Sequence, residues 1–497
     1  MPNHPTLIVD LHTHLFNARC LPLAGIIANA MEKDASESRL ARGAAKLLER
    51  LTESEYRPRI YFKQFDDSVN AYIEALSDLS AKTLTTPFAQ NLSQAKESSP
   101  ATASAMVQIY SDELYADLRE LEDILIEEGG LDSSQHSFVG VDDISEWAKK
   151  IVRATFRRLE ELITLRDEIE NYAEFFFNML HAEEHMAQTL IDDYGDDLPP
   201  LQFVHHMMDM QMAYVVNQTP AQMVKPKYDF YGVQLGRMQD LADRYQTRVF
   251  GFSAFDPRRP DWREIVESSC AKGFRGFKFY TAMGYLPIGN EDPAIEQRVL
   301  EFFRLCIARD IPVFTHCTPV GFQTRFRKGL NADPRNWEKL LAANNGEFAK
   351  LRLCFGHAGG GRADNNGFSS PGWVASEAEW NSPGNYAWNV ARLCRKYENV
   401  YCEFAYITEL IEGSAAEQNA AYARFEANLL NALTSNDGES YDFSQKIGYG
   451  SDWHMPSMVD HPRAYLNVFL KMFDDNRPLA AYRENFFWGN AYRYLKI

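Results

Sequence analysis

The sequence predicts a (β/α)8 barrel with a large α-helical insertion after its first strand. Short apolar, β-branched runs that end in polar residues or glycine recur along the chain, and there are eight of them. Segments with helical periodicity separate the later runs, as in parallel sheets whose strands alternate with helices. The stretch between the first two runs is far longer than an ordinary connection between a strand and a helix.

The strands are expected in the following order. The first run spans residues 7–14, and the second follows only at 201–210; the others are 248–255, 274–280, 312–316, 351–357, 400–404 and 446–452. Helices are expected between them at 261–271, 293–309, 337–349 and 387–397. An open doubly wound sheet is the alternative, but it would carry a glycine-rich phosphate turn after its first strand. Here that strand ends in His12-Thr13-His14.

This interpretation divides the chain into two parts. Residues 1–20 and 201–497 form the barrel, and residues 21–200 form a helical insertion that serves as a cap or an oligomerisation domain. Amphipathic runs at 114–128, 144–159 and 160–180 are its expected helices. Residues 92–105 are rich in Ser, Ala, Thr and Gln, which is typical of a linker or a mobile loop.

Composition excludes several classes of protein. With 497 residues, 45% of them hydrophobic, the chain can bury a large core. Acidic residues outnumber basic ones by 69 to 51, which argues against nucleic acid or anionic lipid as a partner. The insertion holds 35 acidic and 17 basic residues, whereas the rest of the chain holds 34 of each, so the net charge of -18 lies in the insertion.

The cellular location is predicted from what the sequence lacks. No run approaches the roughly 20 apolar residues that span a bilayer, and no basic segment followed by an apolar stretch opens the chain. Seven cysteines, without a CxxC pair, are typical of reduced thiols rather than of a disulfide framework. We therefore expect a soluble, cytoplasmic protein, and we leave open whether it forms a homo-oligomer.

Two histidines close the first predicted strand. His12 and His14 lie two residues apart, so the period of two in a β-strand points both side chains to one face. Neutral imidazole nitrogen is a favoured ligand for zinc and its neighbours in the first transition row. If that face is the barrel interior, the pair predicts a metal site at the carboxyl end of the strand.

Three further polar residues close other predicted strands. His316 ends the fifth run, His357 ends the sixth and Asp452 ends the eighth. Barrel enzymes place their catalytic groups at this carboxyl rim. Each of the three could be an ordinary core or loop residue, but together with His12 and His14 they predict one site.

The sequence around these residues contains specific motifs, namely Val9-Asp10-Leu11-His12-Thr13-His14, Phe355-Gly356-His357-Ala358-Gly359-Gly360, Gly450-Ser451-Asp452-Trp453 and the closing Trp488-Gly489-Asn490-Ala491. With them the chain resembles the amidohydrolase superfamily, in particular its amidohydrolase 2 branch of metal-dependent hydrolases and decarboxylases. The resemblance covers residues 7–14 and 201–497 but little of the insertion.

The resemblance implies roles for these residues. His12, His14, His316 and Asp452 would hold a divalent metal, usually zinc and sometimes manganese or iron, and His357 would contact the substrate or the attacking water. Such a ligand set can leave an open position for water or substrate. The ion would lower the pKa of that water towards about 7 and polarise a carbonyl. Asp452 would then act as the general base.

Lys278 leaves the number of ions open. It lies on the fourth run, where binuclear members of the superfamily carry a carboxylated lysine between two ions. An unmodified lysine could instead take part in catalysis by binding a substrate carboxylate. We favour one ion, and two would be bound if Lys278 is carboxylated.

Further candidates for substrate binding lie on the same strands and the loops after them. Tyr280 shares the strand parity of Lys278 and is expected to line the pocket. Arg325 and Arg327 follow the fifth strand, where a guanidinium could clamp a carboxylate, although solvated loop charges are an equal alternative. His454 follows Asp452 and could reach the site from its loop.

Other polar residues have alternative readings. Glu403 on the seventh run is either a buried partner of a barrel cation or a substrate contact. Only one of His205 and His206 is expected to face the barrel. His181 and His185 match the HxxEH pattern of some zinc proteases, but the barrel already supplies a complete ligand set, so we do not predict a catalytic site there.

The predicted function is that of a metal-dependent enzyme that hydrolyses an amide, lactone or ester bond in a small, carboxylate-bearing molecule. A non-oxidative decarboxylase using the same metal site is the first alternative. A catalytically silent barrel, in which the insertion is an interaction module, is the second.

Overall fold

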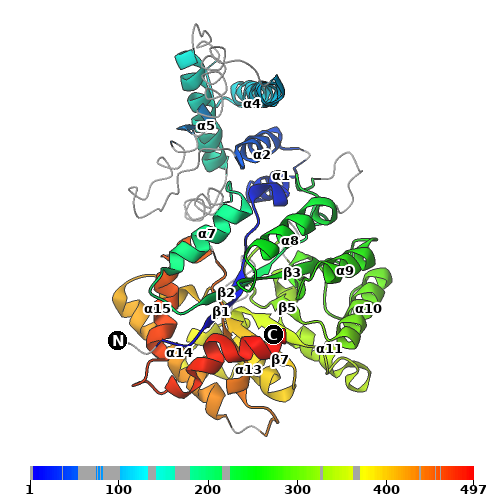
Figure 1. The fold of residues 1–497 in the computed structure, drawn as a ribbon, viewed down its shortest axis with the longest axis vertical. Helices are drawn as coiled ribbons and strands as arrows, with labels where there is room; N and C mark the ends of the chain where they lie inside the picture. Colours follow the sequence, from blue (N-terminus) through cyan, green and yellow to red (C-terminus); the bar gives the residue numbers. More distant parts are fainter. Residues whose placement is uncertain are drawn as a thin grey trace. The chain divides into compact units, whose positions relative to one another are not determined.

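The computed structural model contains one eight-stranded parallel sheet in which every strand pairs with the next one along the chain. Figure 1 shows the strands at the centre, with helices such as α9, α10 and α11 around them. The strands are β1 (Ile8–Thr13), β2 (Leu201–His206), β3 (Val249–Phe255), β4 (Gly276–Phe279), β5 (Val313–His316), β6 (Leu353–Gly356), β7 (Val400–Phe404) and β8 (Ile447–Tyr449). The predicted (β/α)8 barrel with a helical insertion after β1 is therefore confirmed.

The structure describes residues 4–35, 37–53, 74, 77, 78, 80, 81, 101–132, 141–162, 179–214, 224–324, 328–361, 370–435, 438–453, 455–458 and 461–497. The chain divides into two compact units. The barrel unit comprises Met1–Leu15, Ala187–Ala213 and Phe230–Ile497, and the helical unit comprises Phe16–Met186 and Tyr214–Asp229. The predicted roles of the insertion as a cap or oligomerisation domain stay predictions.

The first and last strands close the barrel. Beyond the end of β8, the backbone N–H of Asp452 donates to the carbonyl of His12 over 2.7 Å, and the N–H of His14 donates to the carbonyl of Trp453 over 2.9 Å. Thr13 and Trp453 form a parallel bridge. The carboxyl end of β1 and the chain after β8 are thus held side by side at the rim where the polar residues of both lie.

Helices alternate with the strands and cover the barrel. They are α8 (Leu235–Arg244), α9 (Trp262–Ala271), α10 (Pro293–Arg309), α11 (Pro334–Gly346), α12 (Glu377–Trp380), α13 (Tyr386–Lys396), α14 (Ala415–Thr434), α15 (Pro462–Met472) and α16 (Asn490–Leu495). The boundaries of α10 follow from its sequence. The side chain of Asp292 caps its first turn, Pro293 occupies the first helical position, and the chain leaves the helix at Asp310 in the left-handed conformation.

The interior of the barrel contains an apolar layer. Val9 and Leu11 of β1 pack there with Val204, Phe252 and Phe314, and the C-terminal helix α16 contributes to the same cluster. All residues of β4, β5, β6 and β8 are buried. Strands buried on both faces read as continuous apolar runs, which is why the sequence marks them clearly.

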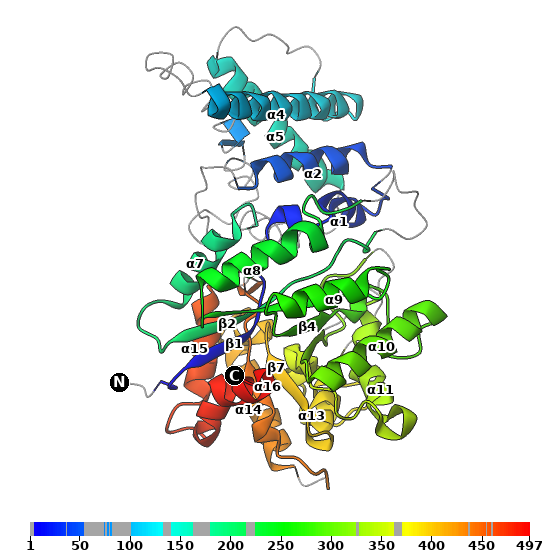
Figure 2. The same cartoon turned by 45° about the vertical axis from the view of Figure 1, so that its right-hand side comes forward.

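The helical unit is built from α1 (Leu23–Ala30), α2 (Arg39–Leu51), α4 (Ala101–Glu127) and α5 (Val141–Leu162), and α7 (Glu183–Tyr194) leads back into the barrel unit. Figure 2 shows α2 and α4 running beside each other within this unit. Gly43 of α2 lies close to α4, since a Cβ there would come within 2.6 Å of Leu121. Glu122 of α4 accepts a hydrogen bond from the indole N–H of Trp147 on α5 over 3.0 Å.

Some predicted elements differ from the observed ones. The second strand ends at His206 rather than at residue 210, because the backbone turns where the Asp209 carboxylate accepts from the N–H of Gln211 over 3.1 Å. The methionines beyond it are buried without being strand, so their apolarity signalled burial alone. The prediction of a linker over 92–105 is wrong for residues 101–105, which begin α4, and residues 92–100 and 163–178 lie outside the described residues.

All seven cysteines are free thiols, as the spacing in the sequence predicts. None of the helices in the described part of the chain is long and apolar enough to cross a membrane.

Candidate metal centre

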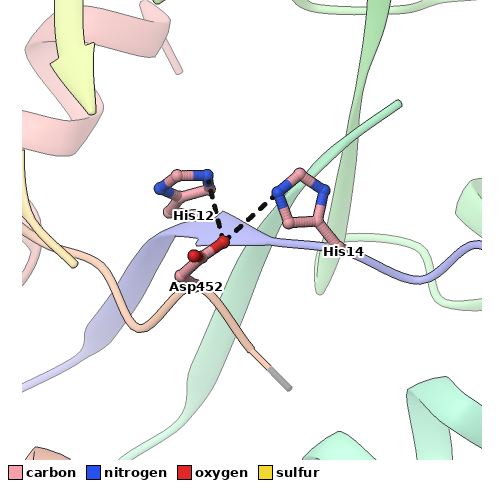
Figure 3. Close-up of side chains that lie close together, drawn as sticks. All are labelled: His12, His14 and Asp452. Atoms are coloured by element: carbon pink, nitrogen blue, oxygen red, sulfur yellow. Dashed lines mark ion pairs between the residues drawn. The ribbon is translucent and has the colours of Figure 1, made fainter. Parts of the chain in front are cut away.

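Three polar side chains from the two ends of the chain meet at the closed seam of the barrel. His12 and His14 come from the end of β1, and Asp452 comes from the loop after β8. Figure 3 shows the Asp452 carboxylate facing both rings; its Oδ1 lies 3.4 Å from His12 Nε2 and 3.3 Å from His14 Nε2. In the described part of the chain, this is the one group of three His, Cys, Asp or Glu residues whose ligand atoms all lie within 4.8 Å of one another.

A β-bulge in β1 places His12. Asp10 pairs with Phe203 and Thr13 with His205, so three steps along β1 correspond to two along β2. As a result Leu11 packs into the apolar layer of the barrel while its neighbour His12 also faces inward, where its ring contacts Phe314. Bulges commonly re-aim side chains next to active sites.

Asp10 ties the two halves of this seam together. Its carboxylate accepts the backbone N–H groups of His12 and Ser451, both over 3.0 Å, and the hydroxyl groups of Ser451 and Tyr194, over 2.5 and 2.8 Å. Burial raises the pKa of Asp10 to about 6, although these hydrogen bonds oppose the shift. Sequence reasoning missed this residue; the available signal was a carboxylate between the apolar residues Val9 and Leu11 of the strand.

Hydrogen bonds at Nδ1 orient the rings of His12 and His14. His12 Nδ1 lies 2.8 Å from Glu403 Oε1, and His14 Nδ1 lies 2.9 Å from the carbonyl of His206. Since a carbonyl and a carboxylate accept hydrogen bonds, both Nδ1 atoms carry the proton. The two Nε2 atoms therefore present lone pairs to the site, which is the arrangement of metal-bound histidines.

His316 and His357 form a second pair at the ends of β5 and β6. His316 Nε2 donates to the carbonyl of Val320 over 2.7 Å, and His357 Nδ1 donates to the carbonyl of Ala405 over 3.1 Å. Their other nitrogens, His316 Nδ1 and His357 Nε2, face each other at 3.1 Å. Burial lowers the pKa of both imidazoles, so two lone pairs meet. Two nitrogens bound to one zinc ion at about 2.1 Å have a comparable separation.

Lys278 lies between the ligand groups. Its buried Nζ is 3.0 Å from His12 Nε2 and 3.3 Å from His14 Nε2, so it donates to the lone pairs that a metal would use. Burial lowers the pKa of Lys278 to about 8, against the opposing charges of Asp452 and Glu403. The amine is thus much closer to its neutral form at pH 7 than an exposed lysine is.

Asp452 remains a carboxylate in this environment. Burial alone would raise its pKa, but contact with His14 and the charges around it outweigh burial and hold the pKa of Asp452 well below its usual range. Its backbone is left-handed, with φ of 61°, as is that of His357, with φ of 59°. Strained backbone of this kind clusters at functional sites.

The remaining predicted site residues have different positions. The Tyr280 ring stacks on His316 with the centroids 4.7 Å apart and lies 5.5 Å from Lys278 Nζ, so it borders the site. Arg325, Arg327 and His454 lie outside the described residues.

Three residues with alternative readings also have definite positions. His206 faces the interior, with its ring centroid 3.9 Å from that of Phe314, whereas His205 accepts the N–H of Leu15. Glu403 contacts His12, which fits its reading as the buried partner of a cation site.

These residues fit a divalent cation on the chemistry of the donor set. One unprotonated nitrogen of each imidazole and the buried Asp452 carboxylate face the site. The other nitrogen of each ring donates to a carbonyl or carboxylate, which fixes the orientation of the ring. His12, His14 and Asp452 are one ligand group, and His316 with His357 is a second group nearby, since the His12 and His357 ring centroids are 4.9 Å apart.

Residues 222–497 match the family model described as Amidohydrolase. This match covers more than half of the chain, and the protein belongs to the amidohydrolase superfamily, in its amidohydrolase 2 branch. The resemblance predicted from the sequence motifs is therefore confirmed. A search of curated proteins finds no match.

Solved structures that match are distant. An amidohydrolase from Burkholderia multivorans with bound zinc is 15% identical, with a TM-score of 0.35, over 53% of this chain and 78% of that one. A 2,6-dihydroxybenzoate decarboxylase from Rhizobium is 14% identical, with a TM-score of 0.40, over 65% and 92%. A 5-carboxyvanillate decarboxylase from Sphingomonas paucimobilis is 14% identical, with a TM-score of 0.34, over 62% and 82%.

Proposed function

We propose that the protein is a metal-dependent hydrolase that cleaves an amide, lactone or ester bond of a small, carboxylate-bearing molecule. The observation that carries the proposal is the convergence of two imidazole lone pairs, from His12 and His14, on the buried carboxylate of Asp452. Membership of the amidohydrolase superfamily supports it. Zinc is the ion we propose, because nitrogen and carboxylate ligands suit it.

Each residue has a stated part in this proposal. A bound divalent ion would supply a water of lowered pKa and polarise the substrate carbonyl. Asp452, held ionised, accepts the proton of the attacking water and passes it to the leaving group. His12 and His14 hold the ion, with His316 as a further ligand. His357, whose Nε2 carries an inward-facing lone pair, accepts a hydrogen bond from the attacking water or the substrate.

Lys278 and Tyr280 are proposed to define the substrate end of the site. The Lys278 ammonium is buried, so it would attract a substrate carboxylate strongly if it leaves the histidine lone pairs when the ion binds. Tyr280, stacked on His316, offers a ring face and a hydroxyl beside it. Carboxylation of Lys278 would instead make it a ligand shared by two ions.

The test combines metal content with activity. Elemental analysis should find about one ion per chain, and His12→Ala or Asp452→Ala should lose the ion together with activity, by at least about 100-fold. His4→Ala, a histidine exposed at the surface, is the matched control and should keep both. Full activity in metal-free protein would contradict the proposal.

The reaction itself is tested with a panel of lactones, amides, esters and aromatic carboxylates. Hydrolysis is followed by the appearance of new acid, and release of carbon dioxide is followed in parallel. Carbon dioxide release without hydrolysis would replace the hydrolase with a decarboxylase that uses the same site.

A further inference from the structure

Glu403 is a fully buried carboxylate that contacts two of the site histidines with a single oxygen. It lies on β7, a strand that supplies none of the proposed metal ligands. Its Oε1 accepts from His12 Nδ1 over 2.8 Å and from the backbone N–H of His357 over 2.9 Å. The side chain is 0% exposed, so solvent does not compete for either contact.

The first contact controls which nitrogen of His12 carries the proton. A neutral imidazole has one proton, and it can sit on Nδ1 or on Nε2. With the proton drawn to Nδ1 by Glu403, Nε2 presents its lone pair towards Asp452 Oδ1 and Lys278 Nζ. Without an acceptor beside Nδ1, only the Lys278 amine would oppose movement of the proton to Nε2, where it would prevent His12 from binding a metal.

The second contact holds the backbone where β6 ends. His357 has a left-handed backbone, with φ of 59°, and so does Ala358, with φ of 47°. Such conformations persist only where surrounding contacts enforce them. Glu403 satisfies the N–H of His357 at this turn, and the carbonyl of Ala405, two residues after Glu403, accepts from the His357 ring.

The neighbouring strand leaves room for this carboxylate. A Cβ added to Gly450 would lie 2.1 Å from Glu403 Oε2 and 3.1 Å from the Cβ of His12. No described donor lies within hydrogen-bond distance of Oε2. The carboxylate is therefore held by Oε1 on one side and by the bare backbone of Gly450 on the other.

We propose that Glu403 is a positioning residue that selects the metal-binding tautomer of His12 and fixes His357 through the same oxygen. The effect on metal binding rests on the proposed function. The effect on the His12 tautomer can be tested in the metal-free protein as well. Glu403 acts through His12 and His357, with no contact to substrate required.

The experiment compares Glu403→Met, which keeps an unbranched chain without an acceptor, with Glu403→Gln, which keeps an acceptor oxygen but adds an N–H donor. Zinc affinity is measured by competition with a chelator. We expect Glu403→Met to bind zinc about 100-fold more weakly than wild type and Glu403→Gln about 10-fold more weakly. Glu122→Met makes the same change at a buried glutamate of the helical unit and should keep the wild-type affinity.

A second readout detects the tautomer directly in metal-free protein with ¹⁵N-labelled histidine. The His12 signals, assigned by their absence in His12→Ala, should show a protonated Nδ1 in wild type and in Glu122→Met, and a protonated Nε2 or a mixture in Glu403→Met. An unchanged His12 spectrum in Glu403→Met overturns the inference. If Glu403→Met does not fold, the wild-type spectrum alone decides: a protonated Nε2 on His12 in metal-free wild-type protein overturns the inference.

The two proposals fail differently. If wild-type protein binds no ion, the proposed function is lost, and the His12 spectrum still decides whether Glu403 selects the tautomer. If wild-type protein binds zinc and the Glu403 variants match it in both readouts, the function stands and the role of Glu403 is lost.

Discussion

The site residues of the barrel unit come from distant strand ends and point to one place, whereas a buried glutamate of the helical unit, Glu122, is paired locally. Asp452 Oδ1 and Lys278 Nζ, from two other strand ends, lie 3.4 Å and 3.0 Å from His12 Nε2. In the helical unit, Glu122 is occupied by Trp147 and Arg119. Convergence without local pairing is typical of a functional site, and local pairing is typical of structural support.

The largest difference between the two units is expected from adding one methyl group to a close-packed glycine of the barrel. In Gly450→Ala the new Cβ meets the Glu403 carboxylate at 2.1 Å. We expect a loss of about 1–3 kcal/mol in the free energy of unfolding, because Glu403 and the backbone must move apart. Zinc affinity should fall as well, since Glu403 holds His12. Chemical denaturation and chelator competition measure the two effects.

Gly43→Ala in α2 is the matched change in the helical unit. Its Cβ would meet the flexible end of Leu121 at 2.6 Å. Alanine gains about 1 kcal/mol over glycine in a helix, which offsets the displacement of Leu121. The free energy of unfolding should change by less than about 1 kcal/mol, with zinc affinity unaffected. Equal effects of the two substitutions on zinc affinity would remove the contrast between the units.

An intermediate effect is expected from a local pair of the helical unit. Trp147→Phe removes the indole N–H that donates to Glu122 over 3.0 Å at a buried position. The cost is about 1–2 kcal/mol, because the carboxylate loses one hydrogen bond but keeps Arg119. Thermal unfolding measures this loss, and bound zinc should stay at the wild-type level. Loss of zinc in this variant would show that the two units are coupled.

The smallest effect is expected at a surface pair on the outer helices of the barrel. Hydrogen bonds from Arg392, and then from Lys396, hold the pKa of Glu338 at about 2, against the opposing effect of burial. Because the folded pKa lies below the ordinary 4.5, the pair stabilises the protein above about pH 4.5 and loses that contribution as the pH falls towards 2.

Glu338→Gln should therefore lower stability at pH 7 by less than about 1 kcal/mol, a discounted figure because the pair is partly exposed and screened by solvent. The difference between variant and wild type should shrink between pH 4.5 and 2 in a series of urea titrations. A difference that is constant over this range would contradict the assignment of the shift to this pair.

Most of the fold was predictable because its signals are local. The eight strands lie within the predicted runs, since parallel strands buried on both faces read as apolar stretches. Helix α10 has its predicted bounds because Asp292, Pro293 and Asp310 mark its ends. The end of β2 was not predictable from apolarity, because Asp209 turns the chain while the methionines around it stay buried.

The sequence predicted which residues belong to the candidate site better than it predicted how their side chains are arranged. His12, His14, His316, His357 and Asp452 stand where the predicted strands end, so a local pattern with the rule for barrel rims was enough to group them. The bulge between Asp10 and Thr13 was not visible, because the alternation of two in a strand gives no sign of an inserted residue.

By itself the sequence determined the order of strands and helices, the family motifs and the polar residues at the strand ends, because each depends on neighbours a few residues away. Tertiary structure alone decided that Glu403 contacts His12 Nδ1 and that Lys278 Nζ contacts His12 Nε2. Those partners are 391 and 266 residues from His12 along the chain. Only closure of the barrel and the register of its strands bring them within hydrogen-bond distance.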